Sequence, residues 1–218
     1  MWIDENGRLS LSFIEASYPS FRAMEDILIR TPYGNVFGKT AGAGSLVLGL
    51  HGWSQRNGWH TWEPLMEPLA EAGFRVVSVD MPGWGQSTLA PGLTQGERAV
   101  ETVLSLLDEL EEDTAVSLLG KSWGGAVAVE AALSQPQRIS HLVLTAPAVR
   151  HPDQLAALTQ PVLLAWAEDD RVIPVEYGRQ LAHTIPNCQL VTYPTGGHNA
   201  APQNAADFAP KTIDFLRR

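Results

Sequence analysis

A serine set between glycines is the residue of this sequence whose surroundings most favour chemistry. Ser122 stands in the run Gly120-Lys121-Ser122-Trp123-Gly124-Gly125, a G-x-S-x-G pattern that follows a strand-like apolar stretch and precedes a helix rich in small residues. A serine in such a sharp strand-to-helix turn has a strained backbone, so the residues two positions away on either side must lack bulk. The pattern predicts a nucleophilic hydroxyl at the C-terminal edge of a sheet.

A serine hydroxyl is a weak nucleophile at neutral pH and needs a base that takes its proton. His198 is the best placed of the four histidines that follow Ser122, because it comes directly after the strand expected at 189–193, in the loop Pro194-Thr195-Gly196-Gly197-His198. Active sites of open α/β sheets lie at that edge. The other three fall at a strand boundary, in a loop and within an amphipathic helix (His141, His151 and His183).

The base in turn needs a carboxylate that orients it. Glu168, Asp169 and Asp170 follow the strand expected at 162–167, and all three belong to the same edge of the sheet. Spacing alone does not separate them, because a shift of one residue decides which carboxylate faces the imidazole.

The elements that must position these groups alternate between short apolar runs and longer helical patterns, which indicates an α/β fold with a mostly parallel sheet. Residues 95–110 carry an apolar stripe at i, i+3, i+4 spacing. Eight strands are expected at 26–31, 35–40, 45–51, 75–80, 115–120, 141–146, 162–167 and 189–193. Five helices are expected at 62–72, 95–110, 124–134, 175–185 and 205–216, and the stripe consists of Val100, Val103, Leu104, Leu107 and Leu110.

The size and composition fit one domain spanning 1–218. The 218 residues are 44% hydrophobic and 18% charged, which is enough for a single sizeable core. Residues 1–24 are the least readable part, although Trp2, Phe13 and Phe21 suggest that they pack on the body. We see no internal repeat and no low-complexity linker.

Charge and cysteine content exclude several classes of partner. With 15 basic and 24 acidic side chains the net charge is −9, which disfavours nucleic acid. Cys188 is the only cysteine, so no internal disulfide, zinc set or other metal site is expected, as suits a reducing cytoplasm. The acidic start and the lack of an apolar run of about 18 residues predict neither a secretory signal nor a membrane span.

Five blocks of residues, taken together and in this order, resemble the α/β-hydrolase superfamily from about residue 26 onward. The first two are an H-G motif that begins at His51 and is followed by Trp62, and the run Asp80-Met81-Pro82-Gly83-Trp84-Gly85-Gln86-Ser87. The others are the elbow at Ser122, an acid loop Asp170-Arg171-Val172-Ile173-Pro174, and Gly196-Gly197-His198.

The resemblance implies a three-layer α/β/α sandwich with an eight-stranded sheet and assigns the roles. Ser122 is the nucleophile, His198 the base and Asp170 the orienting acid, while the backbone N–H groups of Trp53 and Trp123 form the oxyanion hole. Haloalkane dehalogenases and epoxide hydrolases, which resemble this fold, attack with Asp at the nucleophile position, so they do not fit. Two residues depart from the family pattern: Ala167 stands where glycine is common, and Lys121 either changes the local charge or forms a structural salt bridge.

Many family members carry a helical cap before the seventh strand of the sheet, and here only 14 residues, 147–160, are available for it. They suit one short helix at 152–158 and no cap domain. The expected site is open and bounded by aromatic loops, with Trp84 and His151 as pocket residues beside Trp53 and Trp123. Trp166, inside an apolar strand, is expected in the core.

The expected activity is hydrolysis of carboxylic esters of small or exposed substrates, with no cofactor and a small molecule as the only assigned partner. An acyltransferase or perhydrolase that uses the same three residues is an alternative, as is a catalytically idle scaffold that acts as a binding protein. The intact set of Ser122, Asp170 and His198 disfavours the idle scaffold. The sequence does not indicate the substrate or the oligomeric state.

Overall fold

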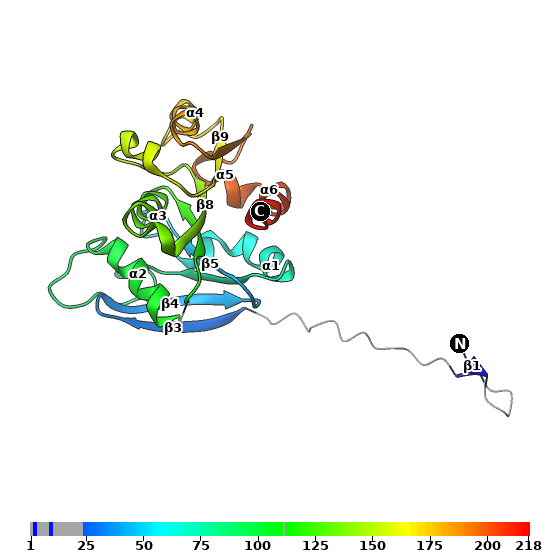
Figure 1. Cartoon of the computed structure of the whole chain (residues 1–218). Helices are drawn as coiled ribbons and strands as arrows, with labels where there is room; N and C mark the ends of the chain where they lie inside the picture. Colours follow the sequence, from blue (N-terminus) through cyan, green and yellow to red (C-terminus); the bar gives the residue numbers. More distant parts are fainter. Residues whose placement is uncertain (1, 4–8, 11–23, 111) are drawn as a thin grey trace.

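An eight-stranded sheet forms the centre of the molecule, as the computed structural model shows for residues 2–3, 9–10, 24–110 and 112–218 (Figure 1). The spatial order of its strands is β10-β9-β8-β7-β5-β6-β4-β3. Their bounds, in chain order, are β3 Glu25–Thr31, β4 Gly34–Ala41, β5 Leu46–Leu50, β6 Arg75–Val79, β7 Val116–Lys121, β8 Ile139–Thr145, β9 Val162–Ala167 and β10 Cys188–Tyr193. A separate two-stranded pair consists of β1 Trp2–Ile3 and β2 Leu9–Ser10. The predicted α/β class is confirmed, and each of the eight predicted strands is found within two residues of its expected bounds.

The pairing of these strands brings the chemistry-bearing loops to one edge. β3 and β4 form an antiparallel hairpin, and β4 also pairs antiparallel with β6. The strands from β6 through β5, β7, β8 and β9 to β10 are parallel, so their carboxyl ends share one edge. The loops that follow β5, β7, β9 and β10 therefore converge, as ligand sites of open α/β sheets require.

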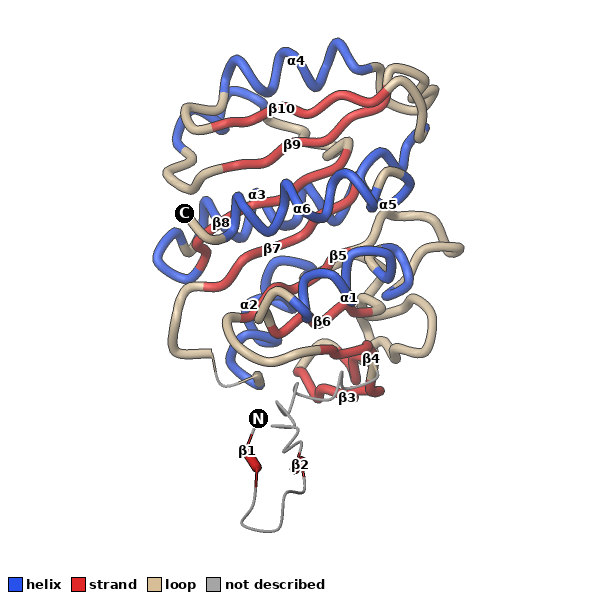
Figure 2. The backbone as a smooth tube through the Cα atoms, turned by 90° about the vertical axis from the view of Figure 1, so that its right-hand side faces the viewer, coloured by secondary structure: helices blue, strands red, loops and turns tan. Residues whose placement is uncertain are grey.

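Helices cover both faces of the sheet. One face carries α2 Ala99–Glu109, α3 Trp123–Ser134 and α4 Val175–Thr184, and the other carries α1 Glu63–Glu71, α5 Ala200–Gln203 and α6 Ala205–Leu216 (Figures 1 and 2). Alternate residues of one strand serve the two cores: Leu46, Leu48 and Leu50 face α2 and α3, and Val47 faces α1. The near-continuous apolar runs of the central strands follow from this double burial.

The helix predicted at 95–110 begins later, at Ala99, and buries a different stripe. Arg98, with a left-handed φ of 59°, precedes its first turn. The buried residues are Thr102, Val103, Leu106, Leu107 and Leu110, so Val100 and Leu104 are only partly buried. Thr102 can lie inside because its hydroxyl donates to the Arg98 carbonyl over 2.8 Å. Hydrophobicity alone missed this satisfied polar residue.

The connection between β8 and β9 contains only a short 3-10 helix, η3 Pro152–Ala157, and no cap domain. This confirms the expectation for 147–160. The side chains of Trp2, Phe13 and Phe21, predicted to pack on the body, lie outside the part of the chain that the structure describes. No helix among the described residues is long and apolar enough to cross a membrane.

Candidate active site

Ser122 occupies the turn between β7 and α3 with strained backbone angles. Its φ of 50° and ψ of −115° lie in a region that costs a residue with a side chain about 1–3 kcal/mol. Hydrogen bonds on both sides hold the strain: the Ser122 N–H donates to the Thr145 carbonyl at 3.0 Å, and the Ser122 carbonyl accepts from Ala126 and Ala148 at 3.1 and 2.9 Å. The serine is presented at the sheet edge by its strained backbone.

Close backbone packing around the turn explains the glycines of the motif. A Cβ on Gly120 would lie 2.6 Å from the Gly125 Cα, and one on Gly124 would lie 2.3 Å from the His51 carbonyl oxygen. Both contacts are with backbone atoms, which cannot move aside independently. Glycine is therefore needed at these two positions because the backbone of α3 packs closely against β7 and the end of β5.

The structure brings Asp170 and His198 together at the same edge. His198 lies in the 3-10 turn η4 Gly197–Asn199, and its Nδ1 is 2.9 Å from Asp170 Oδ2. The other carboxylate oxygen, Oδ1, accepts the N–H groups of Val172 at 2.8 Å and Ile173 at 3.0 Å. The Asp170 carboxylate is thus buried and fixed, and His198 remains partly exposed.

The two neighbouring carboxylates have other partners, which the sequence left open. Asp169 Oδ1 accepts the Gly197 N–H at 2.8 Å, so it holds the loop that carries His198. Glu168 forms an ion pair with Arg179 of α4 at 2.7 Å. Of the three acids, only Asp170 faces the imidazole in this structure.

His51 orients the peptide that carries the Trp53 N–H. The Met81 N–H donates to His51 Nε2 at 3.0 Å, so Nε2 is the unprotonated nitrogen and Nδ1–H donates to the Gly52 carbonyl at 2.7 Å. Burial lowers the pKa of His51, which keeps this neutral form. Because the Gly52 carbonyl and the Trp53 N–H belong to one trans peptide, fixing the carbonyl also fixes the N–H, on its opposite side.

Asp80, the first residue of the run 80–87, organises the facing loop. Its Oδ1 accepts the Trp59 N–H at 2.7 Å, and its Oδ2 accepts the Gln86 N–H at 2.9 Å. A Cβ on Gly85 would lie 2.0 Å from Asp80 Oδ2, so the glycine is needed for this contact. The motifs that contain His51 and Asp80 mark both residues in the sequence. Their hydrogen-bond partners follow only from the fold.

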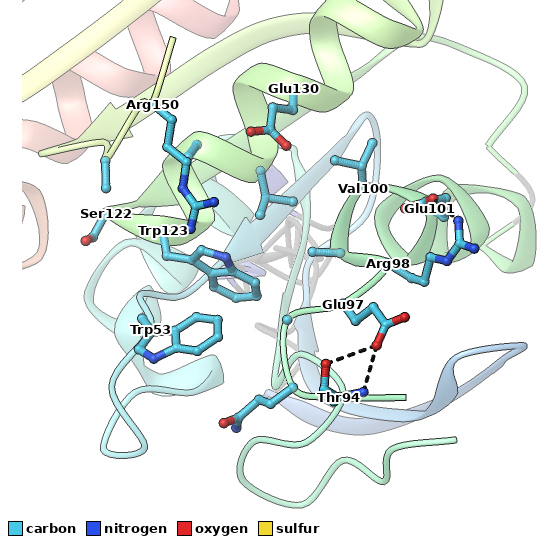
Figure 3. Close-up of a pocket in the computed structure, with 16 residues that line it drawn as sticks. Trp53, Thr94, Glu97, Arg98, Val100, Glu101, Ser122, Trp123, Glu130 and Arg150 are labelled. Carbon is cyan, nitrogen blue, oxygen red and sulfur yellow. Dashed lines mark hydrogen bonds and ion pairs between the residues drawn. The ribbon is translucent and has the colours of Figure 1, made fainter. Parts of the chain in front are cut away.

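A cavity of about 720 Å³ opens beside Ser122. The indole rings of Trp53 and Trp123 lie next to each other in its wall, with centroids 5.4 Å apart, and Ser122 lies to one side of them (Figure 3). Residues 94–101 supply much of the rest of the lining, and Arg150 reaches it from the loop after β8 (Figure 3). Trp123 is also the first residue of α3, where backbone N–H groups have no partner within the helix.

This lining corrects the pocket expected from the sequence. Trp84 is only 1% exposed and lies behind Trp123, with ring centroids 4.8 Å apart, and its Nε1–H donates to the Trp53 carbonyl at 3.0 Å. His151 is exposed and lies outside the lining, whereas its neighbour Arg150 belongs to it. Trp166 is fully buried in β9, as expected.

Lys121 forms no salt bridge within the described residues, contrary to one reading of the sequence. Its ammonium instead donates to Asn57 Oδ1 at 3.2 Å, and its residue is only 6% exposed. Burial lowers the pKa of Lys121, and the nearby Asp170 carboxylate acts in the opposite direction. Among the described residues, no group of three or more His, Cys, Asp or Glu side chains is arranged to hold a metal ion.

Family comparison agrees with this geometry. A model described as "alpha/beta hydrolase fold" matches residues 45–156, just over half of the chain. The chain belongs to the α/β-hydrolase family. A second model, described as "TAP-like protein", matches residues 134–218 of this α/β-hydrolase.

Individual relatives of this α/β-hydrolase are also hydrolases. A 2-hydroxy-6-oxononadienedioate/2-hydroxy-6-oxononatrienedioate hydrolase from Cupriavidus pinatubonensis is 27% identical, over 81% of this chain and 88% of its own length. A 2-hydroxy-6-oxo-6-phenylhexa-2,4-dienoate hydrolase from Burkholderia cepacia is 24% identical, over 81% and 89%. The crystal structure of a CIB-like hydrolase from Thermoplasma acidophilum superposes with a TM-score of 0.81 at 23% identity, covering 89% of this chain and 98% of that one. The protein is accordingly a hydrolase.

Proposed function

We propose that the protein is a serine hydrolase that cleaves carboxylic esters of small or exposed substrates through an acyl-enzyme on Ser122. The observation that carries the proposal is the 2.9 Å contact between His198 Nδ1 and Asp170 Oδ2 at the edge where Ser122 is presented at a positive φ. Asp170 is buried and holds the imidazole with its Nδ1 protonated, which leaves Nε2 free to accept a proton.

In the proposed reaction the Ser122 oxygen attacks the ester carbonyl while His198 Nε2 takes the hydroxyl proton. The backbone N–H groups of Trp53 and Trp123 stabilise the tetrahedral oxyanion, and each such donor is typically worth about 2.7–4 kcal/mol in the transition state. The proton then passes to the leaving alcohol, and a water molecule, activated by the same imidazole, releases the acid. Asp170 orients the imidazole and stabilises the imidazolium in both steps.

A second candidate is hydrolysis of a carbon–carbon bond in an acidic 6-oxo compound, which the relatives favour. The compounds for which the Cupriavidus and Burkholderia enzymes are named contain a ketone and carboxylates but no ester. Hydrolysis of such a compound must therefore break a carbon–carbon bond. The Arg150 guanidinium in the cavity lining suits a carboxylate of this type of substrate.

The decisive experiment is labelling with a fluorophosphonate probe, with Ser122→Ala as the control, followed by turnover of two substrate sets. We expect the wild type to be labelled and to hydrolyse p-nitrophenyl esters. The turnover of a 2-hydroxy-6-oxo-dienoate is measured by the loss of its absorbance. A preference for this compound over the esters would support the second candidate instead.

Two further outcomes would identify the alternatives. Labelling together with turnover only in the presence of an alcohol or peroxide acceptor would indicate acyl transfer or perhydrolysis. A folded wild type that is not labelled would contradict the proposal and point to a binding scaffold.

A further inference from the structure

A buried lysine lies directly behind the proposed nucleophile, and the mechanism above does not use it. Of the three lysines in the chain, Lys39 and Lys211 pair with Asp26 and Asp207, whereas Lys121 at the end of β7 is 6% exposed and pairs with no carboxylate in the described residues. A buried ammonium without an ionic partner is unfavourable for the fold. Its presence beside the site calls for a reason other than stability.

The lysine side chain connects the nucleophile turn to the loop that carries the Trp53 N–H. A Cβ placed on Gly52 would be 3.6 Å from Lys121 Cε, 3.5 Å from Ser122 Cβ and 3.2 Å from Asn57 Nδ2, so these groups crowd one point. Asn57 accepts the hydrogen bond from the ammonium, and its own N–H donates to the Ser54 carbonyl at 2.8 Å. The segment 52–58 is thereby fastened to β7.

The lysine charge also lies close to the acid of the site. The field of Asp170 reaches Lys121, and Asp170 in turn contacts His198. A cation at this position opposes a second positive charge on the imidazole. The other titratable groups that face this corner are His51 after β5, Asp80 after β6, Asp169 after β9, and His60, which acts on His51.

We propose that Lys121 is a positioning residue of the hydrolase. Through Asn57 it holds the 52–58 loop against the nucleophile turn, and it places a buried positive charge beside the Asp170 carboxylate that contacts the imidazole. This inference rests on the proposed role of Ser122.

The test measures the rate of fluorophosphonate labelling of Ser122 as a function of pH, which requires no knowledge of the substrate. For Lys121→Met we expect the plateau rate to fall roughly tenfold, because the loop donor is misplaced. We also expect the acid limb of the labelling profile to move to higher pH, because the variant no longer places a positive charge beside the acid of the site.

Further variants separate the tether from the charge. Asn57→Leu removes the tether and keeps the charge, so its plateau falls while its acid limb stays in place. Lys121→Arg keeps the charge and restores the acid limb. In the double variant of Lys121→Met and Asn57→Leu, the plateau is no lower than in Lys121→Met alone, because the tether needs both partners. Lys211→Met, at an exposed lysine of α6, is the matched control and behaves as wild type.

An unchanged plateau or an unchanged acid limb in folded Lys121→Met overturns the inference. If circular dichroism shows that this variant does not fold, Asn57→Leu and Lys121→Gln take its place. A wild-type plateau in Asn57→Leu, or a wild-type acid limb in Lys121→Gln, then overturns it. Absence of labelling in the folded wild type is a different result, because it contradicts the role of Ser122 itself.

Discussion

Three consecutive carboxylates after β9 show how the placement of a single residue decides its chemistry. Asp170 contacts the imidazole, Asp169 holds the backbone of the loop that carries it, and Glu168 pairs with a helix arginine. The choice of Asp170 from the sequence came from a family pattern, because strand ends are known from a sequence only to within a residue or two. The contact with His198 depends on where the loop after β10 lies, which no local pattern contains.

We predict that Asp170→Asn lowers turnover far more than Asp169→Asn. The amide at 170 offers the imidazole a poor partner and disturbs its tautomer, so the loss is on the order of 10⁴-fold. At 169 an asparagine oxygen still accepts the Gly197 N–H, so we expect less than about a tenfold loss. Steady-state kinetics on one p-nitrophenyl ester compare the two, and the reverse ranking would reject Asp170 as the orienting acid.

Lys121→Met is predicted to stabilise the fold at neutral pH while it impairs the site. The substitution removes a buried cation and keeps an unbranched side chain, so the melting temperature rises by about 2–4 °C for each kcal/mol gained. Because burial lowers the pKa of Lys121 below 10.5, the native wild type loses its proton before the unfolded chain does. As pH rises from the lowered native pKa of Lys121 toward its unfolded value, the free energy of unfolding of the wild type therefore increases relative to that of the variant.

Urea unfolding of both proteins at pH 7 and at pH 10 checks this difference. Lys211→Met serves again as the control, since its exposed ion pair contributes little. A variant less stable than wild type at pH 7 would show that Lys121 supports the fold itself.

At the scale of elements, the segment between β5 and α1 depends on a neutral His51. Its Nε2 accepts the Met81 N–H only when unprotonated, and burial holds its pKa below 6.5. The stability that this histidine contributes is complete above pH 6.5 and is lost as pH falls toward its lowered pKa, because the unfolded chain then binds a proton that the native imidazole resists.

We predict that His51→Gln weakens this acid dependence. An amide oxygen can still accept a hydrogen bond but does not titrate. Urea unfolding at pH 7.5 and pH 5 should show a larger loss for wild type than for the variant. Burial also lowers the pKa of His141, so some acid dependence remains in both proteins and the difference between them is the quantity to measure. Equal losses would contradict the role of His51.

The packing of α3 against β5 yields a sharper structural prediction. The Cβ introduced by Gly124→Ala meets two backbone oxygens, those of His51 at 2.3 Å and Leu50 at 2.7 Å. We expect a destabilisation of about 1–3 kcal/mol and a slower labelling of Ser122, because the nucleophile turn must shift. Glu130→Ala on the exposed side of the same helix should change stability by no more than about 0.5 kcal/mol. Thermal unfolding and probe labelling of both variants test the pair.

Element types and order could be predicted from the sequence because alternation, apolar periodicity and the glycines of the turns act locally. The start of α2 could not, since a left-handed Arg98 shifts the helix and a self-satisfied Thr102 enters the core. The hydrogen bond between Lys121 and Asn57 could not be predicted from the sequence either, because it joins positions 64 residues apart. The burial of Trp84 beneath Trp123 likewise requires the tertiary fold.

At the scale of the whole molecule, the short connection between β8 and β9 leaves the cavity without a cap. In the alignment with the Cupriavidus enzyme, 81% of the 218 residues of this chain spread over 257 positions, so that enzyme carries segments that this chain lacks. Loops and the N-terminal turns of α2 and α3 therefore form the walls, and one of the loops contains Trp53, which is 52% exposed.

We predict weak discrimination by acyl length. Full burial of a methylene is worth about 0.8 kcal/mol, or roughly fourfold in rate, and a half-open cavity recovers only part of it. The increase in kcat/KM along a series of p-nitrophenyl esters should stay below about fourfold per methylene. Trp53→Ala should flatten the series further, whereas a steep, saturating series would indicate an enclosed pocket.

The three indoles at the site also provide an intrinsic spectroscopic signal for ligand binding. Trp53 is open to solvent and in edge contact with both Trp84 and Trp123, whose rings stack behind it. A ligand that enters the cavity displaces water from one of these rings, and the electronic coupling of the stacked pair gives a signature in near-ultraviolet circular dichroism. Binding of any candidate substrate to Ser122→Ala can thus be followed by emission and dichroism without a label.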